Sequence, residues 1–264
     1  MGVSPGTRHI IHSIQVLDCL GMGDTTGVLA GLSWVKDNFQ SPAVINLSIG
    51  IKGISSTLST MIKSMRALGI VIVGAAGNQG DNACLYFPAG ITASNDVPVV
   101  GVGALAQPTG LSDVAASFSN YGSCVRIYAP GDMILSTLPG GLTGKKRGTS
   151  MASPFLAGAI ILALATTPSL SAVEAQSLVL ARATIGTVTG ANVFSGTNNV
   201  LWVPPALSQP TVPPALATTS VSVSTSTTNA ATTNAVITST TGAARSASLT
   251  ATTSNAAAST RAAA

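Results

Sequence analysis

The sequence predicts an α/β protein in which a mostly parallel central sheet is flanked by helices on both faces. Continuously apolar runs of strand length, such as AVINLSI at 43–49 and IVIVGA at 70–75, are typical of strands buried on both sides. Segments with apolar residues every three or four positions alternate with these runs, which favours strand–helix–strand units. Only 8% of the 264 residues are charged and 46% are hydrophobic, so a large core is expected.

The predicted elements follow one another along residues 1–203. The β-branched run HIIHSIQVL is expected to be the first of five strands, at 9–17, 43–49, 70–75, 97–102 and 125–128. Four helices are expected at 25–39, 57–68, 154–164 and 171–182. Thr25 or Thr26 is the expected N-cap of the first helix, and Gly69 lies just beyond the second as a C-cap. Pro154 suits the first turn of the third helix.

The composition changes near residue 204, where Pro and then Ser, Thr and Ala predominate. Residues 204–264 contain no aromatic residue and have only Arg245 and Arg261 as charges. Such a segment buries too little apolar area to offset its ordering entropy, so a disordered tail is expected after a folded domain at 1–203. The tail is interpreted either as a plain flexible segment or as an O-glycosylated stalk.

The charge and hydropathy of the sequence argue against a nucleic-acid surface and against a membrane span. The net charge of +4 is small, and the basic residues are scattered except for the triplet at 145–147, so no nucleic-acid surface is expected. That triplet is interpreted as an exposed turn, with a processing site and a substrate rim as alternatives. The longest apolar run, 155–165, is shorter than the roughly 20 residues of a membrane span, so it predicts a buried core helix. No apolar signal segment is visible at the N-terminus.

Ser150 and Asn78 are the first candidates for a functional site. Ser150 precedes the predicted helix at 154–164, where it could be a nucleophile or an ordinary N-cap. Asn78 follows the strand at 70–75 beyond its carboxyl end, where α/β sheets bind ligands. It is interpreted either as an amide donor or as a turn residue of Asn-Gln-Gly. Taken singly, each residue leaves both interpretations open.

Several motifs around Ser150 and Asn78 occur in the order in which a known protein family has them. GTSMASP at 148–154, with Ala157-Gly158 behind it, resembles the active-site serine motif of the subtilisin-like serine proteases. INLSIG at 45–50 resembles one wall of their specificity pocket, and GAAGNQG at 74–80 resembles their oxyanion-hole loop. Further matching segments follow in the family's order at 16–35, 116–131, 134–141 and 198–202. The resemblance covers residues 1 to about 203, is closest to the proteinase K-like branch, and implies a three-layer subtilisin-like fold.

The resemblance implies a role for each matching residue. Ser150 is the expected nucleophile and Asn78 the expected oxyanion donor, since a serine at a helix N-terminus places its backbone N–H beside the developing charge. The substrate backbone is expected to pair as an added strand with Leu20, Gly21, Met22 and Gly23. The pocket for the residue before the scissile bond is expected to be lined by Ser48, Ile49, Gly50, Ala75, Ala76 and Gly77.

The three cysteines suggest one pair and one orphan. The resemblance implies a disulfide between Cys84 and Cys124, and it matches Cys19 to a cysteine whose usual partner lies upstream, close to the catalytic histidine. No metal or other cofactor is expected. Arg126 stands where proteinase K-like enzymes often have a calcium-binding aspartate, near the carbonyls of residues 98 and 100, and its positive charge would repel Ca²⁺.

The family's His-Gly-Thr-His and Asp-Ser/Thr-Gly motifs do not occur in the sequence. His9 and His12 lie in the predicted first strand without that motif, and Asp18 aligns with a strand end rather than with the triad acid. The sequence is therefore expected to be N-terminally truncated, with a fold incomplete at that end and the activating Asp/His pair before Met1.

Three functions are weighed on these grounds. The expected function is a serine-type endopeptidase that acts on peptides and proteins, monomeric and extracellular in its full-length form, with this chain lacking the activating pair. One alternative is a catalytically dead domain that binds peptides in the 20–23 groove without cutting them. The other is a surface stalk protein whose functional part is the tail.

Overall fold

The computed structural model describes residues 9–93, 99–108, 112–190 and 196–203. Residues 97 and 98 of the predicted strand at 97–102 lie outside these ranges. The strand is observed from Val100 onward. The predicted tail at 204–264 lies outside the described residues.

A four-stranded parallel sheet forms the centre of the domain, with strand order β1-β3-β5-β7. These strands are β1 (Val44–Leu47), β3 (Val71–Ala75), β5 (Val100–Leu105) and β7 (Ile127–Pro130). Three small two-stranded sheets join β2 (Ile51–Lys52) to β4 (Tyr86–Phe87), β6 (Asp113–Val114) to β10 (Val188–Thr189), and β8 (Ile134–Thr137) to β9 (Thr143–Lys146). The predicted mostly parallel sheet is thus confirmed.

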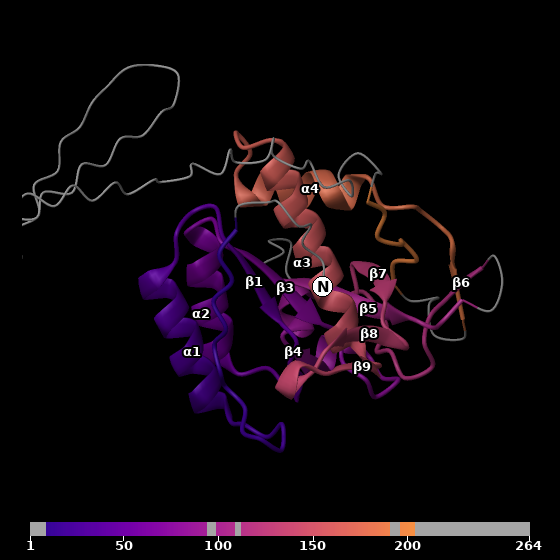
Figure 1. Ribbon diagram of the computed structural model, residues 1–264, viewed down its shortest axis with the longest axis horizontal. Coiled ribbons are helices and arrows are strands. Elements are labelled where there is room, and N and C mark those ends of the chain that lie inside the picture. The colour runs from indigo at the N-terminus through magenta and orange to yellow at the C-terminus, as the bar shows by residue number, and fades with distance from the viewer. Residues whose placement is uncertain (1–8, 94–98, 109–111, 191–195, 204–264) are drawn as a thin grey trace, which may run out of the picture. The chain divides into compact units, whose positions relative to one another are not determined.

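Helices cover both faces of the central sheet (Figure 1). The four helices are α1 (Thr25–Asn38), α2 (Ser56–Ala67), α3 (Thr149–Thr166) and α4 (Ala172–Ala181). Alternate residues of β3 point to opposite faces. Ile72 packs with α1 and α2, whereas Val71 and Val73 pack with α3 and α4. The result is the predicted three-layer arrangement.

Short side-chain caps set the helix starts. The carboxylate of Asp24 accepts the N–H of Gly27 at 2.7 Å, so Asp24 caps α1. The prediction of Thr25 or Thr26 as N-cap was therefore wrong by one or two residues. Ser55 caps α2 in the same way. The predicted C-cap of that helix is confirmed, because Gly69 follows it with φ of +81°.

Helix α3 begins at Thr149, five residues before the predicted start at Pro154. Pro154 has no N–H and cannot bond the Ser150 carbonyl four residues earlier, which would ordinarily disfavour a proline inside a helix. The hydroxyl of Ser48 donates to that carbonyl at 2.8 Å instead. The residue directly after strand β1 therefore supplies the hydrogen bond that the helix lacks, and the helix continues through Pro154.

Helix α3 lies in the core, as predicted for its apolar run. By length and composition alone its 18 residues could cross a membrane, but 56% of them are buried inside the domain. Its small buried residues, such as Ala152, Ala159 and Ala163, let the helix pack closely on the sheet.

The predicted strand at 9–17 was wrong. This segment is irregular and belongs to none of the described sheets, while Ile10 and Ile11 are 76% and 73% exposed. Its later part lies against α1, where Val16 and Ile14 approach Gly31. β-Branched residues favour a strand only where a neighbouring strand completes the ladder, and β1 pairs with β3 alone in the described sheet.

Candidate active site

Ser150 is the second residue of helix α3, and Gly148 is the N-cap. Gly148 has φ of 145°, a conformation that favours glycine, and as the N-cap residue it has no side chain with which to cap the helix. The interpretation of Ser150 as an ordinary N-cap was therefore wrong. The hydroxyl of Ser150 donates instead to the carbonyl of Ser48 at 3.1 Å.

The first N–H groups of a helix have no partner within the helix itself, so each needs another acceptor. At the start of α3, the N–H of Gly148 donates to Gly131, the N–H of Thr149 to the Asn78 side chain, and the N–H of Met151 back to Gly148. The N–H of Ser150 has no acceptor among the described residues. The nucleophile candidate thus carries the one helix-start donor that remains open to a ligand oxygen, at the positive end of the helix dipole.

Asn78 lies three residues beyond β3 and reaches the start of α3. Its Oδ1 accepts the N–H of Thr149 at 2.8 Å and the Thr149 hydroxyl at 2.9 Å. A backbone N–H can only donate, so the atom that faces it must be the amide oxygen. The NH₂ group of the exposed Asn78 side chain is thereby turned away from Thr149 as a free donor. Asn78 and Ser150 are thus brought together at one helix start.

Thr149 connects the helix to the loop that carries Asn78. Its side chain is fully buried, and its hydroxyl accepts the N–H of Gly77 at 3.0 Å while donating to Asn78. Sequence reasoning gave Thr149 no role. The signal was its place in GTSMASP directly before the nucleophile candidate.

The Asn120 side chain is hydrogen-bonded to the loop at 76–81. Sequence reasoning gave this residue no role either. Its buried side chain accepts the N–H groups of Gln79 and Asp81 at 2.9 and 3.0 Å and donates to the carbonyl of Ala76 at 2.9 Å. Gly77 has φ of +105°, and a side chain there would collide with the Asn120 amide. The loop is therefore held in one conformation by a residue 42 positions away from Asn78.

Polar side chains also tie α3 to the end of β1. The Ser48 hydroxyl lies 3.1 Å from that of Ser153, which donates to Asn46 Oδ1 at 2.7 Å. Within the described residues the Ser150 hydroxyl has no hydrogen bond other than the one to Ser48, so no imidazole is bonded to it. His12 packs against Trp34 of α1, with ring centroids 5.9 Å apart.

The two segments predicted to line the specificity pocket meet at one edge of the sheet. Residues 48–50 follow β1, and Ala75 ends β3 with residues 76–77 directly after it. These neighbouring strands are parallel in the register Leu47 to Gly74. Ala75, Ala76 and Gly77 are buried, whereas Gly50 is exposed. The two segments lie beside the start of α3, and their role as a pocket stays a prediction.

The predicted substrate strand at 20–23 forms a turn around Asp18. The Asp18 carboxylate accepts the N–H groups of Leu20 and Met22 at 2.8 and 2.9 Å, and the Asp18 carbonyl accepts that of Gly21. Leu20 and Met22 expose their side chains. Pairing with a substrate backbone would have to release these bonds, so this role also stays a prediction.

An ion pair fixes the far end of the loop at 76–81. Lys52 Nζ lies 3.5 Å from Asp81 Oδ2, and the Tyr86 hydroxyl donates to the same oxygen at 3.0 Å. The N–H of Asn82 is the largest cause that lowers the pKa of the Asp81 carboxyl, followed by the Tyr86 hydroxyl. β2, β4 and the loop are held together by this charged cluster.

The predicted disulfide is present. Cys84 and Cys124 are bonded, with Cα atoms 5.2 Å apart, and link the segment after the 76–81 loop to the segment before β7. Cys19 is exposed and reduced.

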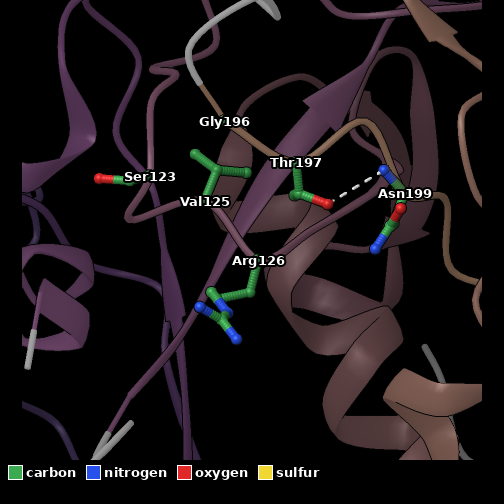
Figure 2. A pocket seen from close by; sticks show the side chains of 6 residues that line it. All are labelled: Ser123, Val125, Arg126, Gly196, Thr197 and Asn199. Carbon is green, nitrogen blue, oxygen red and sulfur yellow. Dashed lines mark hydrogen bonds between the residues drawn. The ribbon is translucent and has the colours of Figure 1, made fainter. Parts of the chain in front are cut away.

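Arg126 lines a cavity of about 360 Å³ near the start of β7 (Figure 2). The other lining residues are Ser123, Val125, Gly196, Thr197 and Asn199. The Thr197 hydroxyl accepts the N–H of Asn199 at 3.3 Å, as the dashed line shows. This described lining has a guanidinium and no carboxylate, and it includes neither residue 98 nor residue 100. The expected loss of the calcium site therefore stays a prediction.

A parallel sheet between two helical layers, with a serine and an asparagine side chain at the start of the central helix, is the arrangement expected of the subtilisin-like fold. Residues 4–200 match the Subtilase family, which is most of the chain. The chain belongs to this family, and the predicted resemblance is confirmed.

Relatives and a solved structure agree with this assignment. The chain is 40% identical over 205 residues to an extracellular serine proteinase of Thermus sp. (strain Rt41A), covering 77% of this chain and 47% of that protein. It is 39% identical over 176 residues to alkaline serine exoprotease A of Vibrio alginolyticus, covering 67% of this chain and 31% of that protein. The chain thus spans less than half the length of these relatives.

The structure of a cold adapted subtilisin-like serine proteinase matches with a TM-score of 0.64 and 35% identity, over 72% of this chain and 65% of that one. The predicted subtilisin-like fold is therefore confirmed.

Proposed function

We propose that this domain is part of a serine-type endopeptidase, in which Ser150 is the nucleophile and Asn78 is the oxyanion donor. One observation carries the proposal: the N–H of Ser150 and the NH₂ of Asn78, neither of which has an acceptor among the described residues, lie at the same helix start. Both donors are fixed by bonds to Thr149 or by the helix itself, so they need no rearrangement when charge develops. The family membership and the names of the relatives support the same reaction.

The geometry supports the following reaction, in which the general base is not among the described residues. The Ser150 hydroxyl leaves the Ser48 carbonyl, loses its proton to that base and attacks the carbonyl carbon of the scissile peptide. The carbonyl oxygen becomes an oxyanion, which accepts hydrogen bonds from Ser150 N–H and Asn78 NH₂. The positive end of the α3 dipole stabilises the same charge. Collapse of this intermediate expels the amine, and water then hydrolyses the acyl-serine ester.

The alternative function is a domain that binds peptides without cutting them. The specific observation in its favour is the bond of the Ser150 hydroxyl to the Ser48 carbonyl, with no imidazole bonded to that hydroxyl among the described residues. A serine without a general base is a weak nucleophile at neutral pH.

Hydrolysis and binding of one chromogenic peptide, measured separately on the whole protein that carries this domain, test the two functions. Under the proposal, Ser150→Ala abolishes hydrolysis, while Ser64→Ala on α2 leaves it unchanged. Asn78→Ala lowers kcat by about 10²–10³-fold, the range known for such a donor in subtilisin, and changes KM little. Asn38→Ala is the matched control on α1. Binding of the peptide without hydrolysis would establish the alternative, and hydrolysis that survives Ser150→Ala would contradict the proposal.

We also propose that no Ca²⁺ is held beside Arg126. The positive charge of Arg126 and the absence of a carboxylate from the described cavity lining support this. Calorimetric titration should detect no Ca²⁺ binding that depends on this site, and Arg126→Asp should create it. Calcium binding that is lost on changing residues 98–100 in the unaltered background would contradict this proposal.

The name of the Thermus relative supports an extracellular location for the whole protein, and the family supports peptide and protein substrates. We propose a monomer, which sedimentation velocity would test.

A further inference from the structure

Three consecutive cations lead directly into the candidate active site. Lys145 and Lys146 end strand β9, Arg147 follows, and Gly148 then caps helix α3. All three side chains are exposed. None of them forms an ion pair with a carboxylate in the described part of the chain. Three uncompensated positive charges therefore face solvent immediately before the residues that carry the site.

The triplet is close to Ser150 by chain geometry alone. Arg147 is three positions before Ser150, so their Cα atoms are at most about 11 Å apart. The N–H of Gly148 donates to Gly131 at 2.8 Å, which fixes the end of β9 against the loop before β8. The triplet therefore cannot move away from the helix start without breaking this bond.

The Arg147 side chain lies over Phe118, a residue that is hydrogen-bonded to the loop at 76–81. Its guanidinium lies 5.9 Å from the centre of the Phe118 ring. The carbonyl of Phe118 accepts the N–H of Gly80 at 2.9 Å, and Gly80 belongs to the loop at 76–81. Arg147 thus lies on the rim between this loop and strand β9.

The neighbouring strand adds apolar surface to the charges. β8 and β9 form a two-stranded antiparallel sheet in which Lys145 pairs with Leu135, so these two side chains share a face. Leu135 and Leu142 are 62% and 64% exposed. A surface with both exposed leucines and unpaired cations is complementary to a chain with both apolar and acidic side chains.

We propose that the basic triplet 145–147 selects peptides with acidic side chains for this site. The inference rests on the proposed function, because it concerns the peptide that the site takes. Each exposed ion pair is worth about 1.4- to 5-fold in affinity, and a peptide with two acidic side chains forms two such pairs with the triplet. We therefore expect about tenfold tighter binding of an acidic peptide than of its neutral counterpart at low salt. Because salt screens exposed charges, this ratio falls at high salt.

Binding to the full chain, measured by fluorescence anisotropy in a Ser150→Ala background, tests the selection. Three labelled peptides share one apolar sequence and differ only in carrying two Glu, two Gln or two Lys residues. In the chain with the native triplet, affinity should fall in that order at about 0.02 M salt, and the order should nearly vanish at about 0.5 M. Equal affinities of the three peptides at low salt would overturn the proposal, and this result needs only the chain with the native triplet.

Two variants of equal net charge separate the triplet from general attraction. In the first, Lys145, Lys146 and Arg147 become Gln; in the second, Lys36, Lys63 and Arg182 become Gln on the helices. The first should lose the preference for the Glu peptide and keep its affinity for the Gln peptide, whereas the second should keep the preference. Equal loss in both would overturn the proposal in favour of an effect of net charge.

The remaining outcomes are also decisive. If none of the peptides binds, the proposed function fails and this inference fails with it. If the peptides bind equally, the proposed function stands and only the selection is overturned. A single-stranded oligonucleotide of the same charge that binds as tightly as the Glu peptide, and depends on the triplet in the same way, would overturn a peptide as the occupant.

Discussion

Thr149 is bonded twice to Asn78: its backbone N–H and its hydroxyl donate to the same side-chain oxygen, at 2.8 and 2.9 Å. These two hydrogen bonds fix both the position of the Asn78 amide and the direction of its NH₂ group. The hydroxyl also accepts the N–H of Gly77, so one buried threonine orders the loop and the helix start together.

Replacing Thr149 by Val should destabilise the protein by about 1–3 kcal/mol. The change keeps the shape but removes the hydroxyl, which leaves the buried N–H of Gly77 without an acceptor. Urea unfolding measures the change in the free energy of unfolding. Thr149→Ser keeps the hydroxyl and should recover most of that loss, so equal destabilisation by both changes would speak against this role of the hydroxyl.

Replacing Asn120 by Ala should open the loop at 76–81 and lower the free energy of unfolding by about 2–3 kcal/mol. The N–H groups of Gln79 and Asp81 would lose their acceptor, and the carbonyl of Ala76 its donor. Hydrogen exchange at the Gln79 and Asp81 amides should become faster than elsewhere in the domain.

Asn38→Ala is the matched control for this change, since Asn38 is exposed and donates only to the Trp34 carbonyl. It should leave exchange in the loop unaltered. Unchanged exchange at Gln79 and Asp81 in the Asn120 variant would show that the loop does not depend on Asn120.

The layers and the two principal site residues could be predicted because their signals are local. Apolar runs mark β1 and β3 as buried strands, and the motif at 148–154 marks Ser150. Asn120 could not be predicted in this way, because its bonds reach residues about 40 positions away and nothing near it in the sequence indicates them.

The two wrong element predictions have the same physical origin. Pro154 suggested a helix start, but Ser48, about 100 residues earlier in the chain, satisfies the carbonyl that the proline frees. The β-branched run at 9–17 suggested a strand, but no described strand lies beside it to complete a ladder. Local preference gave way to tertiary context in both cases, once through an added partner and once through a missing one.

Removing the disulfide should lower the free energy of unfolding by about 2–4 kcal/mol. Cys84 and Cys124 are 40 positions apart, so the bond closes a long loop and restricts the unfolded chain. The double change of both cysteines to Ser, compared with the oxidised parent by thermal unfolding, measures this loss. Cys19→Ser, the exposed free cysteine, is the control and should leave the Tm unchanged. Reductant should lower the Tm of the parent and of the Cys19 variant alike, and an effect of reductant on the double variant would contradict the assignment.

Tyr128 should make the protein lose stability at alkaline pH. Its side chain on β7 is only 1% exposed, and burial raises the pKa of the phenol to about 12. The unfolded chain has a tyrosine pKa of about 10, so the folded state holds the proton more tightly. The stability from this group is therefore fully present below about pH 10 and is lost as the pH rises toward 12.

Tyr128→Phe has no proton to lose, so its free energy of unfolding should exceed that of the parent by a margin that grows by about 2–3 kcal/mol from pH 9 to pH 12. Urea unfolding at several pH values measures this margin. Tyr121→Phe, a change of the same kind at a half-buried residue, controls for the loss of a phenol elsewhere. Parallel stability curves for the parent and the Tyr128 variant across this range would exclude the buried phenol as the cause of alkaline unfolding.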